Sequence, residues 1–201
     1  TDGTPYGLWC DGPPIPYKDA SNNTYIPIPH SENYRFQIGD WSNGATWTLQ
    51  GPTMLSTRDS VEGHYNNRHW IFGAWSEGNN VYCLAHHEWY QTMRSVDGFG
   101  GINGYSLFNR RWVNGISFVS STNGGASYTP WPADSSNRLV VIPEPWAIQS
   151  KDTHFGFFHP SNIVKEGSYY YACCEQRSLN ADGIHSDAGV SLIRTTNVTT
   201  P

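Results

Sequence analysis

Residues 120–128 read SSTNGGASY, a turn sequence between two stretches that favour extended strands. The flanking stretches, Trp112–Ser121 and Ser127–Trp131, are rich in aromatic and β-branched residues. Between them, Asn123-Gly124-Gly125 supplies residues that readily adopt the positive φ angles of tight hairpin turns. These residues therefore predict a β-hairpin at this point of the chain.

The same arrangement recurs at a spacing of roughly 40–50 residues, which is the repeat length of a four-stranded propeller blade. Further strands are predicted at Thr24–His30, at Leu139–Ile142 and from Val190 onward, and no amphipathic helix stands out. We therefore predict an all-β chain in which residues 1–201 form a single β-propeller domain, with a β-sandwich as the rival fold. The two other predicted hairpins pair His69–Ser76 with Asn80–Glu88, and Phe155–Val164 with Ser168–Cys174.

The composition favours the same fold class and limits the partners. Aromatic residues make up 14% of the chain, and 20 Gly and 13 Pro provide for many turns. The formal net charge of −5 argues against a nucleic-acid partner, and no run of about 18 apolar residues predicts a membrane span. At the predicted repeat length the chain supplies roughly four blades. We therefore expect an incomplete propeller, or one that is closed by a second chain.

Cysteine spacing and short motifs bear on the compartment. The four cysteines match no zinc signature, and they leave open either a disulfide made by Cys10 or a set of buried thiols. Glycosylation sequons begin at Asn22 and Asn197, and the chain starts at Thr1 without a signal peptide. A processed secreted protein and a fragment both fit these features, and we expect an extracellular location.

The opening turn also matches a known motif. Ser121–Tyr128 follows the pattern S-x-N-x-G-x-S-Y, which resembles the Asp-box turn of sialidase-like propeller blades. In that motif an acidic or amide side chain bonds backbone amides of its own turn, and the aromatic residue packs between strands. The resemblance implies these roles for Asn123 and Tyr128, and an ordinary Asn-Gly hairpin is the alternative.

Longer stretches resemble secreted five-bladed propeller proteins that are related to glycoside hydrolases. Furanosidase-type members open with an Asp-x-Pro that carries the catalytic base, and Asp11-Gly12-Pro13 is similar. Their acid lies in a Pro-Glu-Ile segment before a Gly-Tyr-Tyr hairpin, where this chain has Ser161-Asn162-Ile163. The resemblance implies that Asp11 is a base and that Asn162, which cannot protonate a leaving oxygen, orients substrate instead. The stretches that carry it are PHSENYR (Pro29–Arg35), HYNNRHWIFGAW (His64–Trp75), VYCLAHHEWY (Val81–Tyr90), WVNGISFVSSTNGGASY (Trp112–Tyr128) and FFHPSNIVKEGSYYYA (Phe157–Ala172).

Polar residues inside apolar strands are candidates for a site, because a buried polar group without a partner costs roughly 1–3 kcal/mol. His86 and Glu88 share one face of their predicted strand, and His87 lies on the other. A carboxylate beside an imidazole orients it and raises its pKa, so this pair can transfer protons. Metal binding and a structural hydrogen-bond network are the alternatives. The predicted catalytic residues are Asp11, Glu32, Glu88, Glu144 and His86.

The remaining candidates would contact substrate. Arg68 can bind a carboxylate through its planar guanidinium. The rings of Trp41, Trp70, Trp89 and Trp146 can stack on sugars, with packing between blades as the alternative. For Glu32, the alternative to a role in the site is an ion pair with Arg35. Glu175 and Arg177 are expected to pair with each other. The predicted substrate-binding residues are His30, Asn33, His64, Asn67, Arg68, His87, Trp89, His159 and Asn162.

Together these features favour a glycoside hydrolase that acts on a polysaccharide or oligosaccharide in a central propeller pocket. A second hypothesis is a polysaccharide lyase that uses histidine or tyrosine together with Arg68 on a uronic-acid polymer. A third is a glycan-binding propeller without turnover. Carbohydrate is the expected partner, no cofactor is required, and no metal-ligand set is predicted.

Overall fold

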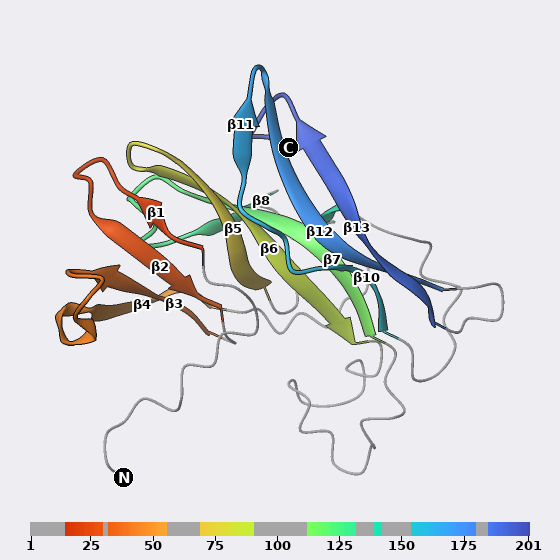
Figure 1. Ribbon diagram of the computed structural model, residues 1–201, viewed down its shortest axis with the longest axis horizontal. Coiled ribbons are helices and arrows are strands. Elements are labelled where there is room, and N and C mark those ends of the chain that lie inside the picture. The colour runs from red at the N-terminus through yellow and green to blue at the C-terminus, as the bar shows by residue number, and fades with distance from the viewer. Residues whose placement is uncertain are drawn as a thin grey trace, which may run out of the picture.

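Three groups of strands make up the described part of the chain. The computed structural model describes residues 15–29, 32–55, 69–90, 112–131, 139–141, 154–179 and 185–201 (Figure 1). These ranges contain no α-helix, and none of their elements is a helix long and apolar enough to cross a membrane. The prediction of an all-β chain is therefore confirmed.

The first group is a four-stranded antiparallel sheet whose strands follow one another in chain order. A short 3₁₀ helix, Gly44–Thr46, lies between the last two strands. The sequence analysis predicted only the second of these strands. It missed the third although Tyr34, Phe36 and Ile38 alternate along it in the way a strand requires. The strands are β1 (Tyr17–Lys18), β2 (Thr24–Ile28), β3 (Glu32–Ile38) and β4 (Thr48–Leu55).

The second group repeats this arrangement. Its four strands again pair antiparallel in chain order, and a short extra strand, β9 (Leu139–Val141), also pairs with β7. One four-stranded antiparallel meander is the repeating unit of a propeller, and two such meanders follow each other here. The predicted fold class is therefore confirmed. The number of blades and the single-domain boundary stay predictions. The strands of the second group are β5 (His69–Glu77), β6 (Asn80–Tyr90), β7 (Trp112–Ser121) and β8 (Thr129–Trp131).

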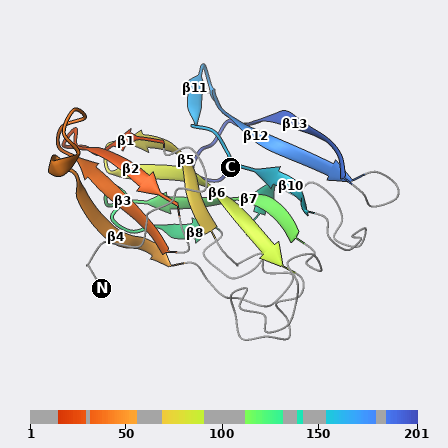
Figure 2. The ribbon, with the colours of Figure 1, turned by 60° about the horizontal axis from the view of Figure 1, so that its bottom comes forward.

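The third group is built around one long strand that pairs antiparallel with three others. Its first strand also runs parallel to the start of β7, with His154 opposite Trp112. This parallel pairing, which we call the sheet junction, joins the second and third groups into one curled sheet (Figure 2). The strands are β10 (His154–Phe158), β11 (Val164–Glu166), the long β12 (Tyr169–Leu179) and β13 (His185–Thr195).

The predicted hairpins are largely confirmed, with one correction. The turns at Gly78 and at Asn123-Gly124-Gly125 lie where expected, between β5 and β6 and between β7 and β8. A continuous strand over Phe155–Val164 is wrong, because the chain leaves β10 after Phe158 and resumes as β11 at Val164. His159 has a φ of +42°, and Pro160 follows without an N–H to donate, so the extended ladder cannot continue there.

Apolar cores lie between successive groups of strands. Phe157 and Tyr170 belong to the core between the second and third groups. The core between the first and second groups contains Tyr17, Tyr25, Met54, Ile71, Val81, Cys83 and Val119, and the core between the second and third also contains Leu84, Ile116, Phe118, Ala172 and Cys174.

The SSTNGGASY turn has the hydrogen bonds that the Asp-box resemblance implies. Asn123 Oδ1 accepts bonds from the Ser127 N–H at 3.0 Å and from Ser121 Oγ at 2.8 Å. Tyr128 packs against the core between the first two groups, and its N–H donates to the Thr53 carbonyl at 3.1 Å. The buried Arg35 donates to the Gly124 carbonyl from the other side. The turn therefore closes on itself and also joins the first two sheets.

Candidate functional site

The predicted site residues fall into three sets. Asn33, His86, His87, His159 and Asn162 are described with their side chains. For Glu32, Glu88 and Trp89 the structure describes the strand position but not the side chain. The predicted residues outside the described ranges are Asp11, His30, His64, Asn67, Arg68 and Glu144.

His86 is the buried centre of a polar group at the sheet junction. It lies on β6, and its Nε2 is 2.5 Å from Asn114 Oδ1 on β7. The ring is 2% exposed, and those of Trp70 and Phe158 stand edge-on to it, each at a centroid distance of 5.5 Å. Burial lowers the pKa of His86 to about 4, although the Asn114 bond acts to raise it. The imidazole is therefore neutral at neutral pH.

His159 connects this buried ring to a charged pair. Its ring lies edge-on to that of His86, with centroids 5.3 Å apart. Its Nδ1 is 3.4 Å from Glu175 Oε2, and Glu175 Oε1 accepts a 2.6 Å bond from Arg177 Nε. The predicted pairing of Glu175 with Arg177 is thus confirmed. We call His86, Asn114, His159, Glu175 and Arg177 the junction cluster.

The Glu175 carboxylate is held in its ionised form. Partial burial acts to raise its pKa, but the hydrogen bonds and positive charge of Arg177, together with His159, lower it below the usual value. The Arg177 guanidinium also lies over the Phe158 ring, 4.5 Å from its centroid. The cluster therefore presents an oriented carboxylate whose partners are fixed by packing.

The sheet junction brings these residues together from distant parts of the chain. Asn114 is paired with Gly156 on β10, and Gly156 is paired with Arg177 on β12. On the other side of β7, Asn114 is paired with Glu88. One row across four strands therefore contains Glu88, Asn114, Gly156 and Arg177. Gly156 has a φ of +115°, and a Cβ there would collide with the Asn114 carbonyl, so the close approach depends on glycine.

His87 lies on the face of β6 opposite to His86, and Asn33 lies on β3 of the first sheet. His87 pairs with His69 across β5 and β6, with ring centroids 4.9 Å apart, and neither has exposed surface. Asn33 from β3 donates to the His69 carbonyl at 2.6 Å and accepts from the Ile71 N–H at 2.9 Å. Its amide is therefore engaged in joining the first two sheets. A substrate contact for Asn33 and His87 stays a prediction.

Asn162 lies beside the first strand of the second group. Its Oδ1 accepts a 3.3 Å bond from the Ala74 N–H, where the β5–β6 ladder is irregular. The preceding residue, Ser161, packs closely on Gly73, where a Cβ would collide with the Ser161 carbonyl. The described contact of Asn162 is therefore with β5 backbone, while a role in orienting substrate stays a prediction.

The sequence analysis did not place Asn114, Glu175 or Arg177 in the site. A signal was present for two of them, because Glu175 and Arg177 are two apart on a strand and share one face. No comparable signal marked Asn114. Its partner His86 comes from a neighbouring strand, and its contact with the third group depends on a parallel pairing between distant segments.

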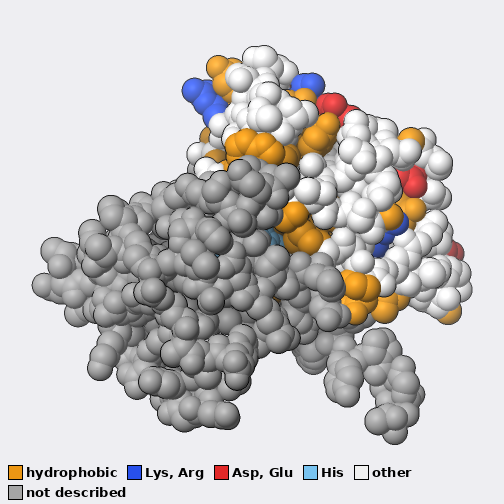
Figure 3. Space-filling model, turned by 180° about the vertical axis from the view of Figure 1, so that it is seen from behind, with side chains coloured by type: hydrophobic (Ala, Val, Ile, Leu, Met, Phe, Trp, Pro, Cys, Tyr) orange, Lys and Arg blue, Asp and Glu red, His pale blue; other side chains and the backbone are white. Residues whose placement is uncertain are grey.

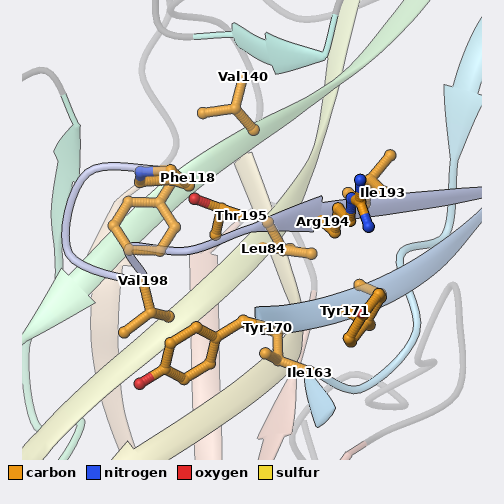
Figure 4. Close-up of a pocket in the computed structure, with 12 residues that line it drawn as sticks. Leu84, Phe118, Val140, Ile163, Tyr170, Tyr171, Ile193, Arg194, Thr195 and Val198 are labelled. Atoms are coloured by element: carbon orange, nitrogen blue, oxygen red, sulfur yellow. The ribbon is translucent and has the colours of Figure 1, made fainter. Parts of the chain in front are cut away.

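A separate apolar pocket of about 90 Å³ lies between the second and third groups (Figure 4). Leu84 and Phe118 form one wall, and Tyr170 and Ile163 face them. Its lining contains one charged side chain, Arg194, and none of the junction cluster. This pocket belongs to the packing between these two groups of strands rather than to the polar site.

Metal ligands and disulfides are absent from the described ranges. No group of three or more His, Cys, Asp or Glu side chains there could hold a metal ion. Cys83, Cys173 and Cys174 are free thiols, and Cys10 lies outside the described residues. Burial raises the pKa of Cys83 to about 12, so this thiol is unreactive at neutral pH.

Comparison with known proteins finds distant structural likenesses. No protein-family model and no curated protein matches the chain. An exo-1,5-alpha-L-arabinanase from a bovine ruminal metagenomic library is 12% identical, with a TM-score of 0.42, over 86% of this chain and 54% of that one. This chain thus spans about half of the length of that enzyme. An alpha-L-arabinanase of Cellvibrio cellulosa is 10% identical, with a TM-score of 0.37, over 94% of this chain and 71% of that one. At these TM-scores the likeness carries no argument about activity.

Proposed function

We propose that the chain is a carbohydrate-active enzyme, a glycoside hydrolase whose reaction centre includes the junction cluster. The observation that supports this most directly is the Glu175 carboxylate, which is ionised and is oriented by Arg177 and His159. The neutral buried imidazole of His86 lies on the other side of the His159 ring. An oriented carboxylate of this kind can stabilise or attack the oxocarbenium-like carbon of a glycosidic transition state. The enzyme would act outside the cell and need no cofactor.

The second carboxylate of the reaction has to be an acid with a higher pKa. Because its pKa is lowered, Glu175 suits the base or nucleophile role rather than the acid role. We propose Glu88 as the acid, since its backbone is opposite Asn114 in the row that contains Arg177. Glu32 and Glu144 remain the other acid candidates from the sequence, and Asp11 remains its candidate for the base. His159, with a side chain 35% exposed and one nitrogen directed at Glu175, would pass protons between solvent and the carboxylate.

The test is hydrolysis of a panel of furanoside- and pyranoside-linked polysaccharides, measured as release of reducing ends. Glu175→Gln and Glu88→Gln should each lower kcat by about 10²–10⁴-fold on the active substrate, as loss of a positioned proton-transfer group does. Glu166→Gln is the matched control, because Glu166 is an exposed carboxylate on β11 outside the cluster. Full turnover by Glu175→Gln, or no reducing ends from any substrate, would overturn the proposal.

A lyase is the second candidate. The observation that favours it is that the junction cluster contains two imidazoles and a guanidinium but, among the described side chains, one carboxylate. β-Elimination from a uronic-acid polymer leaves a carbon–carbon double bond, so ultraviolet absorbance of the products separates it from hydrolysis. Glycan binding without any product would instead indicate a binding module.

A further inference from the structure

The loop that connects β3 and β4 is closed tightly by its own side chains. We call residues 39–47 the Trp41 loop. Asp40 Oδ1 accepts 2.8 Å bonds from both the N–H and the Oγ of Ser42, and the Asp40 N–H donates to Thr46 Oγ1 at 2.7 Å. Asn43 Oδ1 accepts from the Ala45 N–H at 3.1 Å and caps the 3₁₀ helix. The loop is therefore pre-organised rather than loosely extended.

This loop holds a large aromatic ring in solvent. Trp41 is 59% exposed, and its ring stands edge-on to Trp47, with centroids 6.0 Å apart. Trp47 is itself anchored, because its Nε1 donates to the Asp40 carbonyl at 2.9 Å and its ring lies 6.0 Å from that of Phe36. Three rings thus form a continuous row from β3 to the loop tip, and the row supports Trp41 without covering it.

Two exposed polar residues with spare hydrogen-bonding capacity, Asp40 and Asn43, lie within two positions of Trp41 in the loop. The two bonds that Ser42 donates to the Asp40 side chain are both accepted by Oδ1, and the bond that Ala45 donates to the Asn43 side chain is also accepted by Oδ1. Among the described residues nothing bonds Asp40 Oδ2 or Asn43 Nδ2, which leaves one acceptor and two N–H donors within two residues of Trp41. The bonds from Ser42 lower the pKa of Asp40, so the acceptor is ionised at neutral pH.

We propose that the Trp41 loop is a binding site for a neutral polysaccharide, distinct from the reaction centre. A sugar ring has an apolar face that stacks on an indole and hydroxyl groups around its edge that bond to an acceptor and donors such as those of Asp40 and Asn43. The carboxylate of Asp40 disfavours an anionic ligand. A protein partner would need a broad surface, whereas this loop presents one ring among exposed small and polar residues.

The position of the loop fits binding of a long chain. It forms an outer corner of the first sheet, away from the sheet junction (Figures 1 and 2). On the face that Figure 3 shows, charged side chains of the described residues are few and scattered. Because the loop lies away from the sheet junction, only a long polymer chain would contact the Trp41 loop and the reaction centre together. This inference rests on the proposed function only in taking carbohydrate as the class of ligand.

The test is native gel electrophoresis of the whole chain in gels that contain soluble arabinan, xylan, galactan or β-glucan. At least one polymer should retard the wild type, and Trp41→Ala should weaken that binding by about tenfold, the scale of a lost aromatic stack. Trp41→Tyr, which keeps a ring, should fall between the two. Leu192→Ala is the matched control, because Leu192 is a 65% exposed apolar residue on β13, and it should bind like the wild type. All variants should unfold at the wild-type temperature.

The outcomes separate this site from the proposed reaction. Retardation that depends on Trp41, without turnover of any glycan, keeps this inference and removes the hydrolase proposal. Equal retardation of Trp41→Ala and wild type overturns the inference, whatever the turnover. Failure of all four polymers to retard the wild type overturns it as well.

Discussion

The imidazole of His86 and the side-chain oxygen of Asn114 lie 2.5 Å apart across the β6–β7 ladder, at the point where the second and third groups of strands join. The contact orients a buried ring that has little room to rotate, because Phe72 and Phe158 also pack on it. His86 therefore presents a fixed edge to His159, and the charged pair of Glu175 and Arg177 is held beyond it. The cluster depends on one buried neutral histidine.

This burial makes stability depend on pH. The folded-state pKa of His86, about 4, lies below the ordinary value of 6.5. Its contribution is therefore fully present above pH 6.5 and is lost as the pH falls toward 4, because the unfolded chain binds the proton more readily. The loss should be on the order of 3 kcal/mol over that interval. The His86→Gln variant cannot titrate at this position, so its unfolding free energy should fall less than that of the wild type between pH 6.5 and 4. Denaturant unfolding at several pH values measures this.

The wild type and His86→Gln should thus converge in unfolding free energy as the solution is acidified. Acid-sensitive carboxylates that do not interact with His86 contribute alike to both chains and cancel in the difference. Parallel stability curves for the two proteins between pH 6.5 and 4 would contradict the assignment of a buried, neutral His86.

Gly156 should be essential for the sheet junction. Gly156→Ala places a methyl group against the Asn114 backbone at a φ of +115°, so strain and overpacking should together cost roughly 2–5 kcal/mol of unfolding free energy. Gly167→Ala is the matched control, because Gly167 also has a positive φ, +58°, but a Cβ there would meet nothing within 4 Å. It should cost only about 1–2 kcal/mol.

Denaturant melts of the two alanine variants give the comparison directly. If both variants lose the same unfolding free energy, the cost of Gly156→Ala comes from the positive φ alone, and the close approach of β10 to β7 adds nothing to it. The Gly156 variant should also lose any activity of the junction cluster, since Asn114 and Arg177 would no longer share a row.

Arg177 should set the pH dependence of the proposed hydrolysis. Partial burial acts to raise the pKa of Glu175, and the Arg177 bond and charge outweigh it. Arg177→Met should therefore raise the Glu175 pKa, so the acidic limb of the kcat/KM profile should move to higher pH. Arg194→Met is the control, because Arg194 lies over Tyr169 on β13 and outside the cluster.

The profile is measured on whichever polysaccharide the wild type hydrolyses. An acidic limb that stays in place in Arg177→Met, with lowered activity alone, would show that the ionisation of Glu175 does not govern the reaction. A shift in Arg194→Met of the same size would show a general effect of surface charge instead.

Local features of the fold could be predicted from the chain, because their causes lie within a few neighbouring residues. The SSTNGGASY turn was predictable because Ser121, Asn123 and Ser127 bond to one another within one turn. The alternation of His86 and His87 between the two faces of β6 follows from strand geometry in the same way. The break at His159 was missed although Pro160 is a local signal for it, while the left-handed conformation of His159 has no comparable signal in the sequence.

The composition of the junction cluster was not predictable, because it depends on a pairing between segments about forty residues apart. A strand pattern shows which side chains share a face but not which other strand will lie beside it, and parallel pairing leaves no turn sequence to mark it. Residues 112–121 and 154–158 meet only when the second and third groups pack through Ile116, Phe118, Phe157 and Tyr170. That burial of apolar surface between the two groups is what brings a buried histidine, an amide and an ion pair into one site.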